Sequence, residues 1–229
     1  MERPADGRHP VSADSQPSKR GVTEWETVPP VDIRNYPAVK AHLDQYWEKI
    51  EKRYDKGDTP YNLRNCAYME EFAKEKIVWG NLALSSQFAL SKANEFINAP
   101  SPLISPASLF LLAILNSKIG DHYIRSLGVT RNGGYFEYKP MFVEKLPVPQ
   151  LPPEQQKPFE DLVEQILLKK EQNQNTTHLE NQIDVMVYKL YQLDYAEIRV
   201  IDPAIDAVLA SLNLTPERYA EMELADFMV

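Results

Sequence analysis

The sequence changes its periodicity at Pro152-Pro153, and this change constrains the fold more than any other feature. Beyond it, apolar residues recur at helical spacing in two stripes, separated by a polar break at residues 171–177. Two such stripes joined by a short polar segment predict an antiparallel helical hairpin. The stripes are Phe159, Leu162, Val163, Ile166 and Leu167, followed by Leu179, Ile183, Met186, Val187 and Leu190.

Two further short helices are expected after the hairpin, over residues 203–212 and 216–227. Thr215 can cap the second of these, and Pro216 suits its first position because proline there sacrifices no helical hydrogen bond. Residues 151–229 are therefore predicted to be a helical C-terminal region.

Residues 31–150 show a mixed pattern. We expect a helix from Asn35 to the glycine at position 57, and another over residues 108–127. Strand-like runs occupy residues 76–79, 87–90 and 96–98, and Asn132-Gly133-Gly134 is a hairpin-turn signal between two short strands at 129–138. The fold class is therefore α+β, a mixed α/β domain followed by helices. Residues 1–30, rich in polar residues and proline, are expected to form a disordered leader.

Composition narrows the functional classes. No apolar run approaches the roughly 20 residues that span a bilayer, and the N-terminus lacks the layout of a secretory signal, so a cytoplasmic location is expected. Cys66 is the only cysteine and is expected to be a buried, inert thiol. The four histidines are too scattered to suggest a zinc site.

The net charge of −8 lies entirely in the C-terminal region. Residues 171–229 carry 11 Asp or Glu and 3 Lys or Arg, whereas residues 1–170 are neutral. Bulk charge therefore gives no attraction for nucleic acid, and any DNA-facing surface depends on how the charges of the first 170 residues are arranged.

The motifs of a DNA-modifying enzyme are missing from the sequence. An adenine methyltransferase needs a glycine-rich cofactor turn and an Asn or Asp followed by Pro-Pro and an aromatic residue, and neither occurs. We expect no catalytic residue, no metal and no cofactor in this chain. One alternative is a metal-dependent nuclease that uses Glu137 and Lys139, whose acidic-x-Lys spacing places both on one side of a strand, with Asp121 upstream.

Three regions combine basic, amide and aromatic residues, a mixture that can contact phosphates and base edges. Taken singly, each fits an ordinary polar surface at least as well. The candidate DNA-binding residues are Lys56, Arg64 and Asn65 in the first region, Lys118, Arg125, Arg131, Asn132 and Tyr135 in the second, and Lys139 in the third.

The order of several short motifs resembles the TaqI-like C-terminal specificity domain of adenine-specific DNA methyltransferases and fused type IIG restriction-modification enzymes. The resemblance covers residues 33–201. The segments that carry it are Tyr36 to Leu43, Asp58 to Arg64, Lys76 to Trp79, Leu112 to Lys118, Gly133 to Lys139, Phe142 to Pro149 and Ile183 to Leu193.

The resemblance implies a target-recognition domain that binds double-stranded DNA and works with a methyltransferase or nuclease subunit. S-adenosylmethionine is then expected in a partner or in a missing methyltransferase domain, because that half of the family's enzymes is not in this sequence. The chain is expected to be either a separate specificity subunit or the remnant of a broken gene.

The recognition hypothesis assigns phosphate contacts to Lys56, Lys118, Arg125 and Lys139, and base-edge contacts to Arg64, Arg131, Asn132 and Tyr135. Two alternatives remain open. Arg131 can instead pair with a surface carboxylate such as Asp121 or Glu137, and the chain can instead be a helical protein-interaction adaptor with no DNA role.

Overall fold

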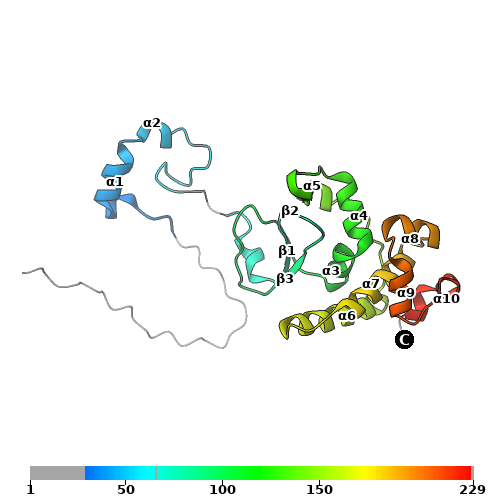
Figure 1. Cartoon of the computed structure of the whole chain (residues 1–229). Coiled ribbons are helices and arrows are strands. Elements are labelled where there is room, and N and C mark those ends of the chain that lie inside the picture. Colours follow the sequence, from blue (N-terminus) through cyan, green and yellow to red (C-terminus); the bar gives the residue numbers. More distant parts are fainter. Residues whose placement is uncertain (1–28, 65, 228–229) are drawn as a thin grey trace, which may run out of the picture. The chain divides into compact units, whose positions relative to one another are not determined.

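The computed structural model describes residues 29–64 and 66–227, and it divides into two compact units after Cys66 (Figure 1). Residues 1–28, which make up nearly all of the predicted disordered leader, lie outside the described residues. We call residues 29–64 and 66 the N-terminal unit and residues 67–227 the C-terminal unit, and describe each by itself.

The N-terminal unit contains a short 3-10 helix, η1 (Ile33–Asn35), and two short helices, α1 (Pro37–Asp44) and α2 (Trp47–Ile50). The single long helix expected from Asn35 is therefore wrong. No described side chain of this unit is fully buried, and Val39, Tyr46 and Trp47 stay exposed. Because no hydrophobic core stabilises one continuous apolar helix face in this unit, individual side-chain contacts decide where the helices end.

Those contacts tie the helices to the following loop. The Tyr61 hydroxyl donates to Asp44 Oδ1 at 2.6 Å, and the Tyr61 ring lies 5.5 Å from that of Trp47. Cys66, expected to be buried, is exposed, because this unit has no interior that could enclose it.

The C-terminal unit begins with a 3-10 helix, η2 (Met69–Ala73), and two small antiparallel sheets. In the first sheet β1 (Lys76–Val78) lies between β3 (Ala89–Ser91) and β4 (Leu103–Ile104), with Ile77 opposite both Leu90 and Ile104. In the second, β2 (Leu82–Ala83) pairs with β5 (Phe136–Glu137). The strands expected at 76–79 and 87–90 are confirmed with shifted ends, whereas residues 96–98 form a loop.

The helix expected over residues 108–127 is two helices, α3 (Leu109–Asn116) and α4 (Lys118–Leu127). The break lies at the buried Ser117, whose hydroxyl donates to the Ile114 carbonyl at 2.7 Å and accepts from the Gly120 N–H at 3.1 Å. Asp184 Oδ1 also accepts the Lys118 N–H at 2.8 Å. Because these partners satisfy the first N–H groups of a new helix, the chain can turn there.

The predicted helical hairpin is confirmed as α6 (Pro153–Glu171) and α7 (Thr177–Leu190), which pack together. Helix α3 packs on α6, with the Phe110 and Phe159 rings edge to face at 5.3 Å. One apolar core therefore contains residues from both sides of Pro153, and the division expected at residue 150 stays a prediction.

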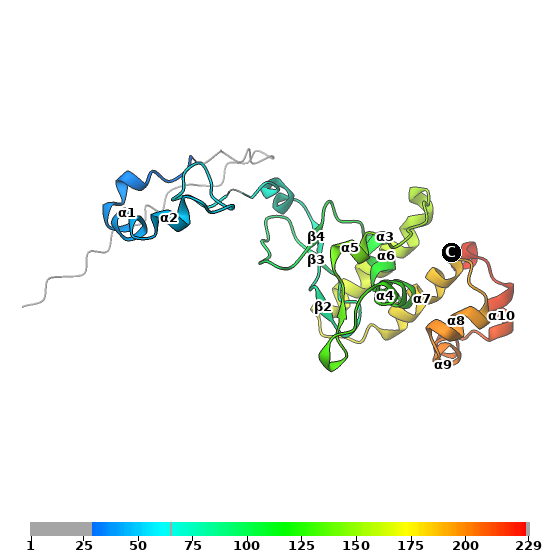
Figure 2. The same cartoon turned by 90° about the horizontal axis from the view of Figure 1, so that it is seen from above.

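The last helices lie together at one end of the unit, where two of them pack on α7 (Figures 1 and 2). They are α8 (Tyr195–Ile201), α9 (Ile205–Ser211), α10 (Pro216–Glu221) and η4 (Leu224–Phe227), and α5 (Pro140–Val143) follows β5 earlier in the chain. Thr215 caps α10 as predicted, accepting the Arg218 N–H at 3.2 Å. The fold class is α+β, as predicted. Among the described residues, no helix has both the length and the apolar character that crossing a membrane requires.

Candidate nucleic-acid interface

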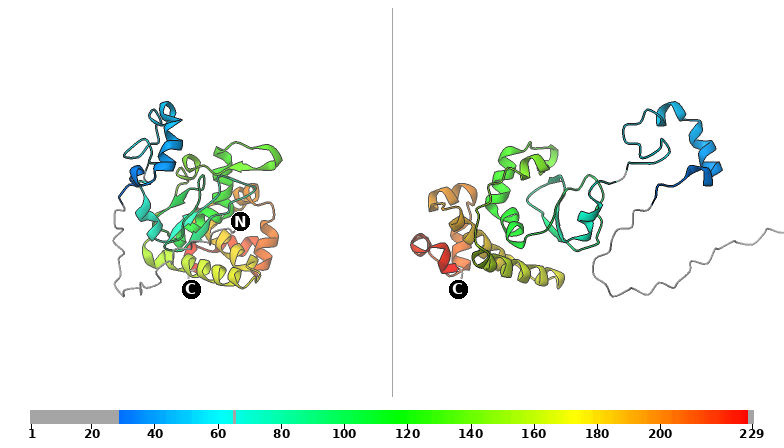
Figure 3. Two further views of the ribbon diagram at one scale, coloured as in Figure 1. Left: turned by 90° about the vertical axis from the view of Figure 1, so that its left-hand side faces the viewer. Right: turned by 180° about the vertical axis from the view of Figure 1, so that it is seen from behind.

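The Asn132-Gly133-Gly134 segment forms a short 3-10 turn, η3 (Asn132–Gly134), at the tip of a narrow loop. Of the two short strands expected at 129–138 only β5 forms, and its strand partner is β2. The base of the loop is closed by a bridge between Thr130 and Phe136 and by the Arg131 N–H, which donates to the Tyr135 carbonyl at 2.7 Å. Gly133 and Gly134 have φ angles of 79° and 81°, which favour glycine. In Figure 3 (left) the chain around this turn, in green, extends from the body of the C-terminal unit. We call residues 130–139 the recognition loop.

The recognition loop carries two cations on one buried carboxylate. Glu137 has a side chain only 4% exposed, and its Oε1 accepts from Arg131 Nε at 2.7 Å and from Arg131 Nη2. Lys139 Nζ lies 3.1 Å from the other oxygen, Oε2. The Arg131 and Lys139 side chains are 54% and 43% exposed. The Arg131 guanidinium and the Lys139 ammonium hold the pKa of Glu137 below its usual range, so the cluster carries one net positive charge.

The strand beneath this cluster is held from both sides. Trp79 Nε1 donates to the Tyr138 carbonyl at 2.6 Å. The Tyr138 hydroxyl donates to Asp121 Oδ1, which also accepts the Ser86 N–H at 2.7 Å. Burial raises the pKa of Tyr138, so its phenol stays a donor. Because rigid neighbours anchor Tyr138, the adjacent Glu137 has a defined position.

Three of the predicted base readers lie together at the tip of the loop. Arg131, Asn132 and Tyr135 line one open hollow with Thr130 and Leu82. Leu82 is 54% exposed, although it belongs to β2. Sequence reasoning missed Leu82, because only the pairing of β2 with β5 brings it beside the loop.

Arg125 and Lys118 lie on α4, two helical turns apart. The Arg125 guanidinium stacks 3.9 Å from the Phe136 ring of β5 and pairs with Asp121 at 3.0 Å. It therefore borders the recognition loop. Lys118 is exposed in the first turn of α4, and its N–H donates to Asp184 of α7 at 2.8 Å.

Lys56 and Arg64 belong to the N-terminal unit and form a separate group. They lie on paired segments, because Lys56 bridges Leu63 and the Arg64 N–H donates to the Asp55 carbonyl at 2.9 Å. Both side chains are exposed, and Lys56 Nζ donates to the Glu51 carbonyl at 2.9 Å. Asn65 lies outside the described residues.

The groups named for a metal-dependent nuclease are engaged with other partners. Both Glu137 oxygens face cations, and both Asp121 oxygens accept hydrogen bonds from protein groups. Among the described residues no three His, Cys, Asp or Glu side chains are grouped to hold a metal ion. The geometry gives the nuclease alternative no support.

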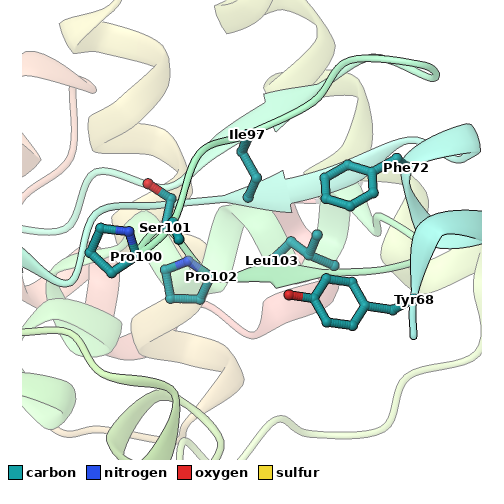
Figure 4. Close-up of a pocket in the computed structure, with 8 residues that line it drawn as sticks. Tyr68, Phe72, Ile97, Pro100, Ser101, Pro102 and Leu103 are labelled. Carbon is teal, nitrogen blue, oxygen red and sulfur yellow. The ribbon is translucent and has the colours of Figure 1, made fainter. Parts of the chain in front are cut away.

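A second hollow lies at the start of the C-terminal unit (Figure 4). The Tyr68 and Phe72 rings stand at one end, and Pro100 and Ser101 at the other. Its lining is apolar or neutral, without a charged side chain. It therefore offers no cation to a phosphate, and no predicted site residue lines it.

The recognition loop presents exposed cations, an amide and an aromatic ring on one surface, groups that can contact a polar or anionic partner. Comparison with known families gives the class: residues 31–148 match the TaqI-like C-terminal specificity domain. This match covers just over half of the 229-residue chain, and the chain belongs to that family. It is a DNA-specificity module of restriction-modification enzymes. Residues 149–201, which the sequence resemblance also included, lie outside the match. No curated protein matches the chain.

Proposed function

We propose that this chain directs an adenine-specific DNA methyltransferase or endonuclease, of the type IIG kind, to its duplex DNA site. The observation that carries the proposal is the recognition loop, where Arg131, Asn132 and Tyr135 share one exposed hollow and the cluster is positively charged. Arg suits guanine and Asn suits adenine in the major groove, while lysines suit phosphates.

In this proposal the cations beside the hollow set the register on the DNA backbone. Lys139 belongs to the loop, Arg125 borders it, and Lys118 lies further along α4. Lys56 would contact phosphate and Arg64 a base edge from the N-terminal unit.

Catalysis and S-adenosylmethionine binding then belong to a methyltransferase domain or a partner subunit. Residues 171–229 carry the whole net charge of −8, which repels DNA phosphates. Helices α7 to α10 would therefore face away from the DNA, where they are free to contact the catalytic partner.

Selection from a random duplex pool tests the proposal. The full chain is used alone and together with the methyltransferase that the proposal gives it as a partner, and the bound duplexes are sequenced. We expect one common sequence to be enriched. Arg131→Ala should cost about 1 to 3 kcal/mol on that site and relax the preference at one position.

Arg199→Ala is the matched control, because Arg199 is an exposed arginine on α8 in the acidic region. It should leave the enriched sequence unchanged. If neither arm enriches a sequence, the chain does not recognise DNA, and the protein-interaction adaptor becomes the better account.

A further inference from the structure

The Arg131–Glu137 pair leaves a defined part of the guanidinium unused. Arginine has five N–H donors, one on Nε and two on each Nη. Glu137 Oε1 accepts from Nε and from Nη2. This engages the side edge of the guanidinium. Three donors remain: one on each Nη, which together form the end edge of the guanidinium, and a second on Nη1, which points back toward the aliphatic part of the side chain.

The end edge presents two parallel N–H donors, which can bind two acceptors of one ligand at the same time. Two parallel N–H groups match the O6 and N7 acceptors that guanine presents in the major groove. The Arg131 side chain is 54% exposed and lines the hollow with Asn132 and Tyr135. The unused donors therefore belong to a residue that a base edge can reach.

Glu137 is built to hold this orientation. Its side chain is 4% exposed, it sits in β5 opposite Leu82, and its neighbour Tyr138 is anchored by Trp79 and Asp121. A flexible arginine whose side edge is held by such a carboxylate loses less conformational freedom when it binds a ligand. An arginine that is free in solvent would lose that conformational freedom when it binds.

We propose that Glu137 is a positioning residue that aims the end edge of Arg131 at a guanine in the major groove. The inference rests on the proposed function and adds to it the base and the second residue that sets specificity. Glu137 itself touches no DNA. Lys139 pairs with the second carboxylate oxygen of Glu137, and the remaining N–H donors of its ammonium group contact the phosphate backbone.

Glu137 also places a negative charge beside two cations that face DNA. A carboxylate there lowers the attraction of the loop for every duplex. Its removal should therefore strengthen non-specific binding while it weakens base discrimination. A carboxylate that merely stabilised the fold would not move these two quantities in opposite directions.

The test uses the full chain, the duplex selected from the pool and its single-base variants, with affinities measured at two salt concentrations. The wild-type preference for guanine at the position sensitive to Arg131→Ala should be about 5- to 150-fold. Glu137→Gln should reduce it to below about threefold. The same variant should bind a scrambled duplex more tightly and steepen the salt slope by about one.

Two further variants keep the test decisive. Glu144→Gln removes an exposed carboxylate of the same loop-to-helix segment without touching Arg131, and should keep the guanine preference. Arg131→Lys keeps the charge but loses the two-donor edge. It should keep the scrambled-duplex affinity and lose the preference, even if Glu137→Gln fails to fold.

The outcomes separate this inference from the proposed function. If the wild type selects a site but Glu137→Gln keeps its full guanine preference, or Arg131→Lys keeps it, the positioning role is wrong and DNA recognition stands. If the wild type shows no sequence preference in either arm of the pool selection, both are overturned.

Discussion

Gly120 lies where α3 and α4 meet, and replacing it tests the packing that sets the direction of α4. It is buried in the first turn of α4. A Cβ atom added there would lie 2.2 Å from the Ile114 carbonyl oxygen and 3.1 Å from that of Leu115. Both are backbone atoms, so no side chain can move aside. The change proposed is Gly120→Ala.

The expected loss in free energy of unfolding follows from the close contacts that an added Cβ would make with the two carbonyl oxygens. A carbon normally stays about 3.3 Å or more from a carbonyl oxygen, so the two helices must separate by about 1 Å. Overpacking of this kind costs about 1 to 3 kcal/mol. The Ile114 carbonyl also accepts from the Ser117 hydroxyl at 2.7 Å, and loss of that bond adds about 1 kcal/mol.

Helix propensity acts in the opposite direction, because alanine is favoured over glycine by about 1 kcal/mol within a helix. We therefore expect Gly120→Ala to lower the free energy of unfolding of the C-terminal unit by about 1 to 3 kcal/mol. That corresponds to a decrease in Tm of roughly 2 to 12 °C.

Urea and thermal unfolding measure the effect, and Gly80→Ala is the control. At Gly80 an added Cβ would lie 3.7 Å from the Leu82 carbonyl oxygen, an ordinary contact. That variant should change stability by less than about 1 kcal/mol, toward greater stability. If Gly120→Ala were as stable as the wild type or more stable, the close approach of α3 and α4 would be refuted.

Two further changes test buried polar groups. Burial raises the pKa of Asp184 from 3.8 to about 7, so its stabilising protonated form is fully present below about pH 4 and is lost as the pH rises through 7. Asp184→Asn keeps an acceptor for the Lys118 N–H but cannot ionise. In urea unfolding from pH 4 to 8, its free energy of unfolding should fall less with pH than that of the wild type and should be higher at pH 8. The same dependence on pH in both proteins would contradict the raised pKa of Asp184. Tyr188→Phe removes the hydroxyl that donates to the buried Asp202 at 3.1 Å, and calorimetry should show a loss of about 1 to 3 kcal/mol; a neutral result would mean that Asp202 has another donor.

The helices after Pro153 could be predicted because local signals and tertiary packing agree there. The stripes from Phe159 to Leu190 become buried faces, and Thr215 and Pro216 start α10 as their chemistry suggests. Where no core forms, the same kind of signal failed: the apolar residues after Asn35 stay exposed or half-buried, and the helix breaks.

The break at Ser117 shows what local patterns omit. Serine is tolerated within helices, and the apolar spacing continues across it. Ser117 caps α4, and the Lys118 N–H donates to the Asp184 side chain, which is 66 residues away in the sequence. No periodicity within residues 108–127 contains that partner.

The sequence could name candidate residues for the site but not the geometry that places them. Arg131, Asn132 and Tyr135 follow from residue type and the turn, and pairing of Arg131 with Glu137 was one of two open alternatives. The burial of Glu137 depends on β2 pairing with β5 rather than on the turn. That pairing makes a surface ion pair into a rigid support, and it also brings Leu82 to the hollow.

An NMR titration of the ¹⁵N-labelled full chain with its selected duplex tests the central claim most directly. The account predicts that the Arg131 Nε–H signal and the backbone amides of residues 130–139 shift or broaden. The amides of α8 to α10 should not change. Changes confined to α6 to α10, with residues 130–139 unaffected, would contradict the claim that the recognition loop binds DNA.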